Sequence, residues 1–270
     1  MDTGSPLESV LKRDRLVVMI GLGLVVILAV AYTMMGVGMN MSALTMTRMA
    51  IEMPGMAMQP VDWSLGYALV VCLMWCVMMV AMMVPSTAPM VLFHAAVSRK
   101  HKEGTGPLTA TVIFMTGNLA VWTLFSLFAT ALQWGLSSLG IISGMMQIVS
   151  PTIAGLVLMT AGLYQLTPLK RACLKHCQQP LSFIIHRWRS GKKGAFRMGL
   201  ENGNYCLGCC WFLMALLFVG GIMNLMWIAG IAIYVGIEKF AIGHHWLTVF
   251  TGVTLMLAGI LTVGSSVLAV

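Results

Sequence analysis

Apolar segments long enough to cross a lipid bilayer recur along this chain, and they limit the folds open to it. A membrane-spanning helix needs about 20 consecutive, mostly apolar residues, and residues 16–35 form the first such segment. The chain is 59% hydrophobic and 9% charged, whereas a soluble domain has about 25% charged residues. The sequence therefore predicts an integral membrane protein of the all-α class, folded as a polytopic bundle of transmembrane helices.

The breaks between apolar segments indicate where each span lies. Pro85 and Pro89 are expected to kink or end the second span, and the first span lacks a small-residue cleavage site, which favours a retained helix over a signal peptide. Seven spans are expected, with six as the alternative, and the ambiguous part is a hairpin of two short or tilted helices. The expected spans are residues 16–36, 64–93, 108–132, 148–166, the hairpin within 206–239 with its break at Gly220, Gly221 and Asn224, and 246–267.

This placement of the spans divides the chain into two parts. Residues 1–63 comprise the first transmembrane helix and a methionine-rich outer loop. Residues 64–270 form a transmembrane bundle of metal-binding type, with a basic, cysteine-containing cytoplasmic loop at 168–204.

Basic residues predict the orientation of the chain in the membrane. The formal net charge is +8, and every Lys and Arg except Arg48 and Lys239 lies in residues 12–15, 99–102 or 170–197. Because basic loops mark the cytoplasmic side, we expect a multi-pass protein of the bacterial inner membrane with a cytoplasmic N-terminus. Anionic headgroups of the lipid bilayer are sufficient partners for these loops, so no nucleic-acid partner is expected.

Methionine is unusually frequent, at 26 residues, and nine of these lie between Met34 and Met58. A thioether is a soft ligand that favours Cu(I), and unlike a thiol it forms no disulfide outside the cell. The alternative is an apolar loop that lies on the membrane or docks on another subunit, a role that leucine would fill equally well. The expected outer ligands are Met39, Met41, Met53, Met56 and Met58.

The second span carries sulfur at helical spacing. Its methionines recur at i,i+4, and two cysteines fall on the face of Met79 and Met83. Neutral sulfurs can pass a soft monovalent ion through hydrocarbon, where a fixed charge would be costly. The alternative is adaptable packing between helices. The expected ligands in this span are Cys72, Cys76, Met78, Met79, Met82 and Met83.

The remaining cysteines flank the predicted cytoplasmic loop. Thiolates bind Cu(I) or Zn(II) tightly, and Cys-x-x-Cys is a common bidentate unit. If the loop folds back, four or five thiols would meet, with His176 nearby. A zinc-stabilised loop is one alternative, because four cysteines are a usual structural zinc set, and inert buried cysteines are another. The expected ligands are Cys173, Cys177, Cys206, Cys209 and Cys210.

Three longer motifs give a resemblance to a known family. They read W-x-x-M-M-x-A-M-M-x-P-x-x-x-P at residues 75–89, Y-Q-L-T-P-L-K-x-x-C-L-x-x-C-x-x-P at 164–180 and C-x-G-C-C-W-x-x-M at 206–214, followed by Met223-Asn224, Trp227 and Glu238-Lys239. In these motifs the chain resembles a bacterial domain-of-unknown-function family of predicted metal-binding integral membrane proteins. The resemblance implies a helical membrane protein that binds metal, and it supplies no reaction.

Two hypotheses for function remain. The leading one is a Cu(I)-handling membrane protein that captures copper outside through methionines and passes it inward to the cytoplasmic cysteines. The alternative is a non-transporting copper-delivery or assembly factor, or an accessory subunit, whose partner is a membrane copper oxidase or monooxygenase or a periplasmic copper protein. We expect no enzymatic activity, because oxygen-activating copper usually depends on imidazole ligands and no outward-facing histidine set is present in the sequence.

Overall fold

The computed structural model of the chain describes residues 6–36, 42–52, 62–100, 106–241, 243 and 245–268. Within this part, the elements are all helices apart from one isolated bridge between Ile142 and Ile148, so the all-α prediction is confirmed. The helices are α1 (Pro6–Met34), α2 (Ala43–Glu52), α3 (Leu65–Lys100), α4 (Pro107–Ser138), α5 (Pro151–Gln165), α6 (Pro168–Gln178), α7 (Pro180–His186), α8 (Gly191–Ala215), α9 (Leu217–Gly220), α10 (Leu225–Phe240) and α11 (His245–Leu268).

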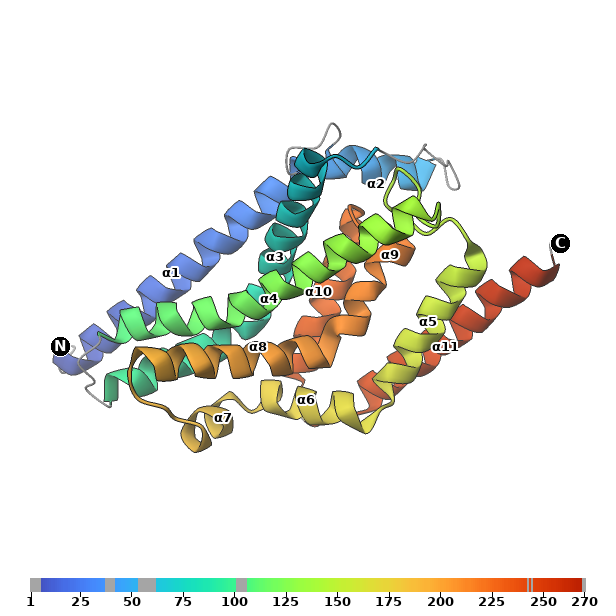
Figure 1. Cartoon of the computed structure of the whole chain (residues 1–270). Coiled ribbons are helices and arrows are strands. Elements are labelled where there is room, and N and C mark those ends of the chain that lie inside the picture. Colours follow the sequence, from blue (N-terminus) through green and yellow to red (C-terminus); the bar gives the residue numbers. More distant parts are fainter. Residues whose placement is uncertain are drawn as a thin grey trace.

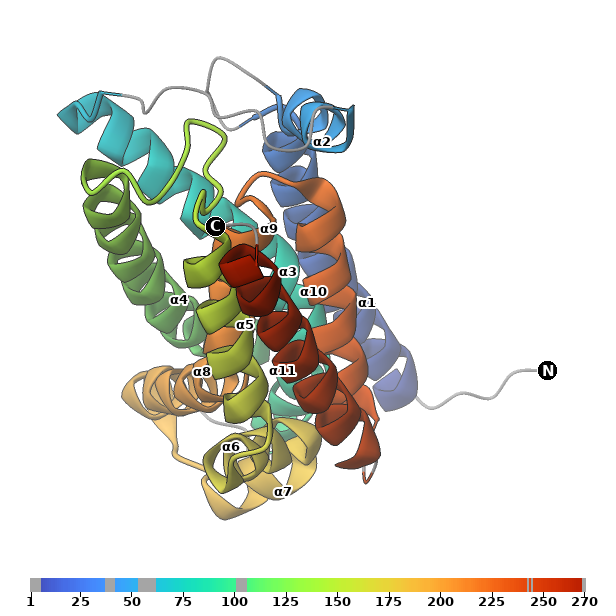
Figure 2. The same cartoon turned by 90° about the vertical axis from the view of Figure 1, so that its right-hand side faces the viewer.

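The long helices run between two ends of the bundle (Figure 1). Helix α2 lies across one end, and α6 and α7 lie across the other. Helices α5 and α11 lie at the right-hand side in Figure 1 and side by side at the front in Figure 2, and most of the contacts made by α11 are with α5. The chain therefore forms a main bundle with an attached two-helix arm.

In the part of the chain that the structure describes, five helical segments are long and apolar enough to cross a membrane: Leu16–Met34, Leu65–Arg99, Leu108–Ser138, Gly191–Gly220 and His245–Ser266. The count becomes six if α5 and α6, which meet at a 64° bend, form one broken span. The predicted seven spans are therefore not confirmed. The shortfall lies in α5 and α10, which have 15 and 16 residues; at about 1.5 Å per residue neither reaches the roughly 30 Å of a hydrocarbon core.

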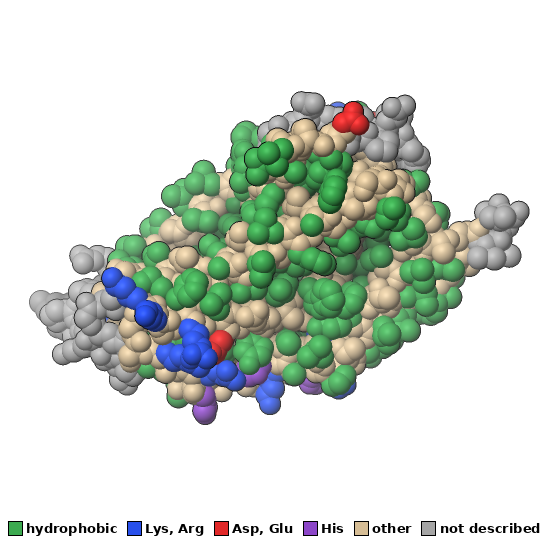
Figure 3. Space-filling view, in the orientation of Figure 1, with side chains coloured by type: hydrophobic (Ala, Val, Ile, Leu, Met, Phe, Trp, Pro, Cys, Tyr) green, Lys and Arg blue, Asp and Glu red, His purple; other side chains and the backbone are tan. Residues whose placement is uncertain are grey.

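Hydrophobic side chains cover most of the face in Figure 3, and Lys and Arg gather at the end that carries α6 and α7. Three of these bases, Arg187, Arg189 and Arg197, converge on the single carboxylate of Glu201 at N–O distances of 3.1 to 3.6 Å. The basic and apolar surfaces are thus segregated, as they are in chains that meet both lipid and water.

Helix α3 is longer than the sequence predicts. It passes through Pro85 and Pro89 and ends only at Lys100, although proline removes a backbone donor and usually interrupts a helix. Between the two prolines, Ser86 and Thr87 each donate from the side chain to the carbonyl of Met83, at 3.0 and 2.9 Å, which adds hydrogen bonds to this part of the helix. Of the two predicted outcomes, a kink or an end of the span at these prolines, the end is wrong.

The segment 168–204, expected as a loop, is mostly helical, since it contains α6, α7 and the first half of α8. Cys206 therefore lies within α8 and does not open a new helix. Part of the expected outer loop is also helical, as α2. The break predicted between Gly220 and Asn224 is confirmed: Gly221 has φ +92°, and the Asn224 side chain caps α10 by accepting from the amide of Met226 at 3.1 Å.

Glycine allows the closest helix crossings. A Cβ added at Gly199 of α8 would lie 2.0 Å from the carbonyl oxygen of Phe114 in α4. In the arm, a Cβ at Gly162 of α5 would lie 2.6 Å from the carbonyl oxygen of Gly252 in α11. Small residues let backbones approach in this way when lipid offers no hydrophobic drive for association.

Candidate metal centre

The three cysteines of α8 face the interior of the bundle. Cys206, Cys209 and Cys210 lie at i, i+3 and i+4, which places them on one face of the helix, and each is at most 2% exposed. The thiol of Cys210 contacts the thioether of Met83 on α3, with 3.9 Å between Sγ and Sδ. Residues 127 positions apart thus bring two buried sulfurs into contact.

Helix α6 brings further thiols to this place. The Cys177 thiol is in hydrogen-bonding contact with Cys209, and Cys209 and Cys206 each contact Cys210. We call Met83, Cys177, Cys206, Cys209 and Cys210 the sulfur centre. The expected folding back of the cysteine-containing segment onto α8 is what the structure shows.

Cys173 also lies against α8, one turn before Cys177. Its Sγ would be 2.8 Å from a Cβ added at Gly208, so the missing side chain of Gly208 leaves space for this thiol. Cys173 packs beside the sulfur centre, where it interacts with Cys209.

Lys239 of α10 supplies a positive charge at the sulfur centre. Its Nζ donates to the Cys206 sulfur at 3.1 Å and to the Ser86 hydroxyl at 2.8 Å, and the residue is 4% exposed. A buried lysine needs a polar or anionic neighbour because desolvating its charge is costly. The Cys206 thiol, once ionised, is such a neighbour.

A second buried lysine belongs to an adjacent ion pair. Lys170 of α6 is fully buried, and its Nζ lies 2.8 and 2.7 Å from the two carboxylate oxygens of Glu238. The Tyr234 hydroxyl donates to the same carboxylate at 2.5 Å, and Gln165 accepts from Lys170. Lys170 is therefore not a surface base that meets lipid headgroups, as its place in a basic segment suggested.

Adjacent residues of α10 thus serve different partners. Glu238 pairs with Lys170 of α6, whereas Lys239 turns to Cys206 of α8 and Ser86 of α3. Helix α10 therefore ties three other helices together around the thiols.

The sulfurs of α3 fall into two sets. Met78, Met79 and Met82 are buried in the same apolar cluster as Met83. Cys72 and Cys76 are only partly buried; they contact each other, and Cys76 contacts Ser126 of α4. The structure therefore brings Met83 to the thiols of α8 and leaves the two α3 cysteines at a separate place, nearer the end that carries α2.

The predicted outer ligands Met39, Met41, Met53, Met56 and Met58 lie outside the described residues. Their part in capturing copper remains a prediction.

The side chains of the sulfur centre do not surround a point as a zinc site does. Within the described residues, no three His, Cys, Asp or Glu side chains form a group that could hold a metal ion. The Sγ atoms of Cys209 and Cys210 instead lie 3.1 and 3.0 Å from the carbonyl oxygen of Cys206. What the centre presents is a set of pairwise sulfur contacts, one of which involves a thioether.

The described histidines near this region have other neighbours. His176, expected near the thiols, stacks on Tyr205 with 4.1 Å between ring centroids. His94 is buried and stacks on Phe114 at 4.6 Å. Both rings pack against aromatic side chains and away from the sulfur centre.

A cavity of about 150 Å³ adjoins the sulfur centre at the end that carries α6 and α7. Its buried wall includes Ser86, Thr87, Asn202 and Lys239. Its more exposed rim includes Cys177, Gln178, Pro180 and Phe240. We call it the Lys239 cavity; it joins a thiol of the centre to the exterior of the bundle.

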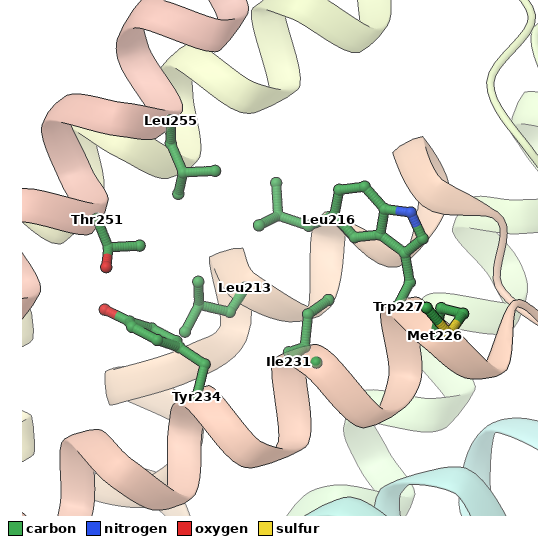
Figure 4. Close-up of a pocket in the computed structure, with 9 residues that line it drawn as sticks. Leu213, Leu216, Met226, Trp227, Ile231, Tyr234, Thr251 and Leu255 are labelled. Carbon is green, nitrogen blue, oxygen red and sulfur yellow. The ribbon is translucent and has the colours of Figure 1, made fainter.

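A second cavity, of about 270 Å³, is of a different kind (Figure 4). It lies between α8, α10 and α11, and leucines, Ile231 and Trp227 form most of its wall. The hydroxyls of Tyr234 and Thr251 face each other at one end. We call it the apolar cavity; among the described residues, its lining contains no cysteine and no charged side chain.

The structure is thus a helical bundle with buried thiols and a thioether, which are soft metal ligands. Residues 72–262 match the model of the PpoB2 family, described as copper chaperones. Because the match covers more than half of the chain, the protein belongs to this copper chaperone family. Family membership suggests that the chain handles copper, which agrees with the interpretation of its sulfur residues. Neither curated proteins nor solved structures gave a match.

Sequence reasoning missed the polar neighbours of the sulfur centre. Lys239, Ser86 and the Lys170–Glu238 pair were not predicted there. One signal was available: two charges inside an otherwise apolar segment are costly in a membrane and usually have a functional or structural partner.

Proposed function

We propose that this protein is a membrane copper chaperone that holds Cu(I) in the sulfur centre. In this proposal copper is cargo, and the protein carries it without catalysing a reaction. The contact of Cys210 with Met83 carries the argument, because a thiol and a thioether meet there in a buried place of a chain from a copper chaperone family.

The ligand types favour copper over zinc. Thiolate and thioether sulfurs select soft ions such as Cu(I), whereas structural zinc takes four tetrahedral ligands that do not include methionine. Two or three sulfurs suffice for Cu(I), and pairwise contacts of the kind seen for Cys210 with Met83 and for Cys177 with Cys209 offer that number. Zn(II) at the inner cysteines is the alternative occupant.

Lys239 supports the charge balance of such a site. Two thiolates with one Cu(I) carry a net negative charge, which is costly in a low-dielectric interior. The ammonium group 3.1 Å from Cys206 compensates that charge. The same group would stabilise an ionised thiol before copper arrives.

We further propose an orientation in the bacterial inner membrane with the α6–α7 end in the cytoplasm. The three arginines around Glu201 lie at that end, and basic segments mark the cytoplasmic side. The sulfur centre is then nearer the reducing cytoplasm, where thiols stay reduced. The lipid bilayer is the partner of the apolar surface.

Cu(I) titration of the purified chain against a competing chromophoric chelator tests the proposal. We expect tight binding that is lost when Cys206, Cys209 and Cys210 are all replaced by serine. The matched control is Cys72→Ser with Cys76→Ser, which removes two thiols of α3 away from the sulfur centre and should keep the tightest site. Equal Cu(I) affinity in the triple variant and the wild type would refute the proposal.

The arrangement of α3 supports a second candidate, inward transport of Cu(I). Met78, Met79 and Met82 are buried in the cluster that also contains Met83, so thioethers extend from the sulfur centre along α3. Copper captured by outer methionines would pass along them to the cysteines. The delivery alternative instead hands copper to a membrane copper oxidase or monooxygenase or to a periplasmic copper protein.

Copper accumulation by cells that express the chain separates the two candidates. In the transport candidate, replacing Met78, Met79 and Met82 together by leucine lowers accumulation while Cu(I) affinity at the sulfur centre remains. If accumulation does not change, the delivery candidate is favoured.

A further inference from the structure

The Lys239 cavity has features that the proposed function does not use. It combines a buried ammonium group, a thiol and several neutral polar groups beside the sulfur centre. We propose that this cavity binds a small anionic thiolate, which exchanges Cu(I) with the sulfur centre. The inference rests on the proposed function, because it names the ligand through which copper enters or leaves that centre.

The volume of the cavity sets the size of this ligand. About 150 Å³ is far more than one water needs, since a cavity of about 10–15 Å³ already holds one. It is nevertheless too small for a folded partner to insert more than a side chain. A small organic molecule of a few heavy atoms fits these limits.

The polar wall sets its charge. Lys239 has three N–H donors, and two of them meet Ser86 and Cys206. Lys239 also lines the cavity, so an anion bound there would accept from its third N–H. Asn202 and Gln178 add amide groups to the same wall, although Asn202 also donates to Asn118 and Gln178 donates to the carbonyl of Glu238.

The position of Cys177 sets the chemistry. This thiol lines the cavity and contacts Cys209 of the sulfur centre. A thiolate in the cavity can therefore replace a protein sulfur on the bound copper directly. The incoming thiolate forms a Cu–S bond, and the bond from copper to a protein sulfur breaks. Copper stays Cu(I), the freed cysteine keeps the electron pair as a thiolate, and Lys239 compensates its charge. Loading is the reverse of this step.

Copper release from the loaded wild-type protein tests the inference. Bathocuproine disulfonate traps released Cu(I) as a coloured complex and is itself too large for the cavity. Thioglycolate and cysteamine are thiols of similar size and opposite charge, and each is added at the same thiolate concentration. We expect release to be at least about tenfold faster with thioglycolate, because one hydrogen bond to a charged group has roughly that effect.

Matched variants locate the effect in the cavity. Thr87→Phe fills the Lys239 cavity and should abolish the acceleration by thioglycolate. Thr251→Phe makes the same change in the apolar cavity (Figure 4) and should leave the acceleration unchanged. Lys239→Met should remove the preference for the anionic thiol.

The outcomes separate this inference from the proposed function. If the wild type binds no Cu(I), the proposed function fails. If it binds Cu(I) but the two thiols accelerate release equally, the inference is wrong while the proposed function stands. The comparison of the two thiols uses the wild-type protein alone. It can therefore refute the inference even if Thr87→Phe folds poorly.

Discussion

Helices pack against one another in both the main bundle and the α5–α11 arm, but the side chains at their contacts differ. In the arm, no Asp, Glu, Lys or Arg occurs in α5 or α11, and the two helices meet through pairs of glycines such as Gly155 with Gly259. In the main bundle, helices α3, α6, α8 and α10 meet around thiols, Met83 and two buried lysines. Close glycine packing also occurs in the main bundle, as at Gly199 against Phe114, but there buried lysines and sulfur are added.

The difference shows that the buried charges of this apolar chain lie in the main bundle, beside the thiols. Glycine packing needs no desolvated charge, so the arm is stabilised without a buried charge. Buried charges lower stability unless they are paired, and the main bundle retains two of them beside its thiols. We infer that these charges serve the sulfur centre, and the predictions below test this contrast, beginning with the largest effect.

Breaking the buried ion pair should have the largest effect. Lys170→Met leaves the carboxylate of Glu238 buried, with Tyr234 as a remaining donor, and should lower the free energy of unfolding by about 3–5 kcal/mol. Thermal unfolding in detergent measures it. The double variant Lys170→Met, Glu238→Met should recover most of the lost free energy of unfolding. If Lys170→Met alone is as stable as the wild type, the ion pair does not stabilise the main bundle.

Crowding the arm should have a smaller effect and spare copper binding. A Cβ at Gly162 would lie 2.6 Å from the carbonyl oxygen of Gly252, so Gly162→Ala should cost about 1–3 kcal/mol through overpacking. Gly264→Ala is the matched control, because a Cβ there meets no atom within 4 Å. Unfolding and Cu(I) titration are measured together, and a loss of Cu(I) affinity in Gly162→Ala would show that the arm is part of the site.

Removing the charge beside the thiols should act on copper more than on folding. Lys239→Met should weaken Cu(I) binding by about 10–100-fold, as is typical when a group that supports a metal ligand is lost. Competition with a chelator measures the affinity. Lys239→Arg keeps the charge and should retain more of the affinity; equal losses in both variants would point to packing as the cause.

Replacing one thioether should have the smallest effect. Met83→Leu conserves volume and should change the free energy of unfolding by less than about 1.5 kcal/mol, but it removes the sulfur 3.9 Å from Cys210. Cu(I) affinity should fall, and X-ray absorption should show one fewer sulfur ligand. Met256→Leu in α11, where the side chain packs near Gly162, should change neither quantity.

Local patterns in the sequence predicted much of this protein. Apolar segments gave the helical class, and Gly221 with Asn224 gave the break before α10, because both depend on neighbouring residues. The number of spans and the end of α3 were predicted less well. Helix α3 continues through Pro85 and Pro89 to Lys100, because its packing against α1 and α4 outweighs a local helix-breaking signal.

The sequence by itself determined which residues the centre has available: cysteines at i, i+3 and i+4 on one helix face, methionines at i,i+4 on another, and two charges in an apolar segment. Only the tertiary structure decided which of them meet. It joined Cys210 to Met83, Cys177 to Cys209, and Lys170 to Glu238. Helical periodicity sets the face on which a side chain lies, whereas a partner many residues away depends on how whole helices pack.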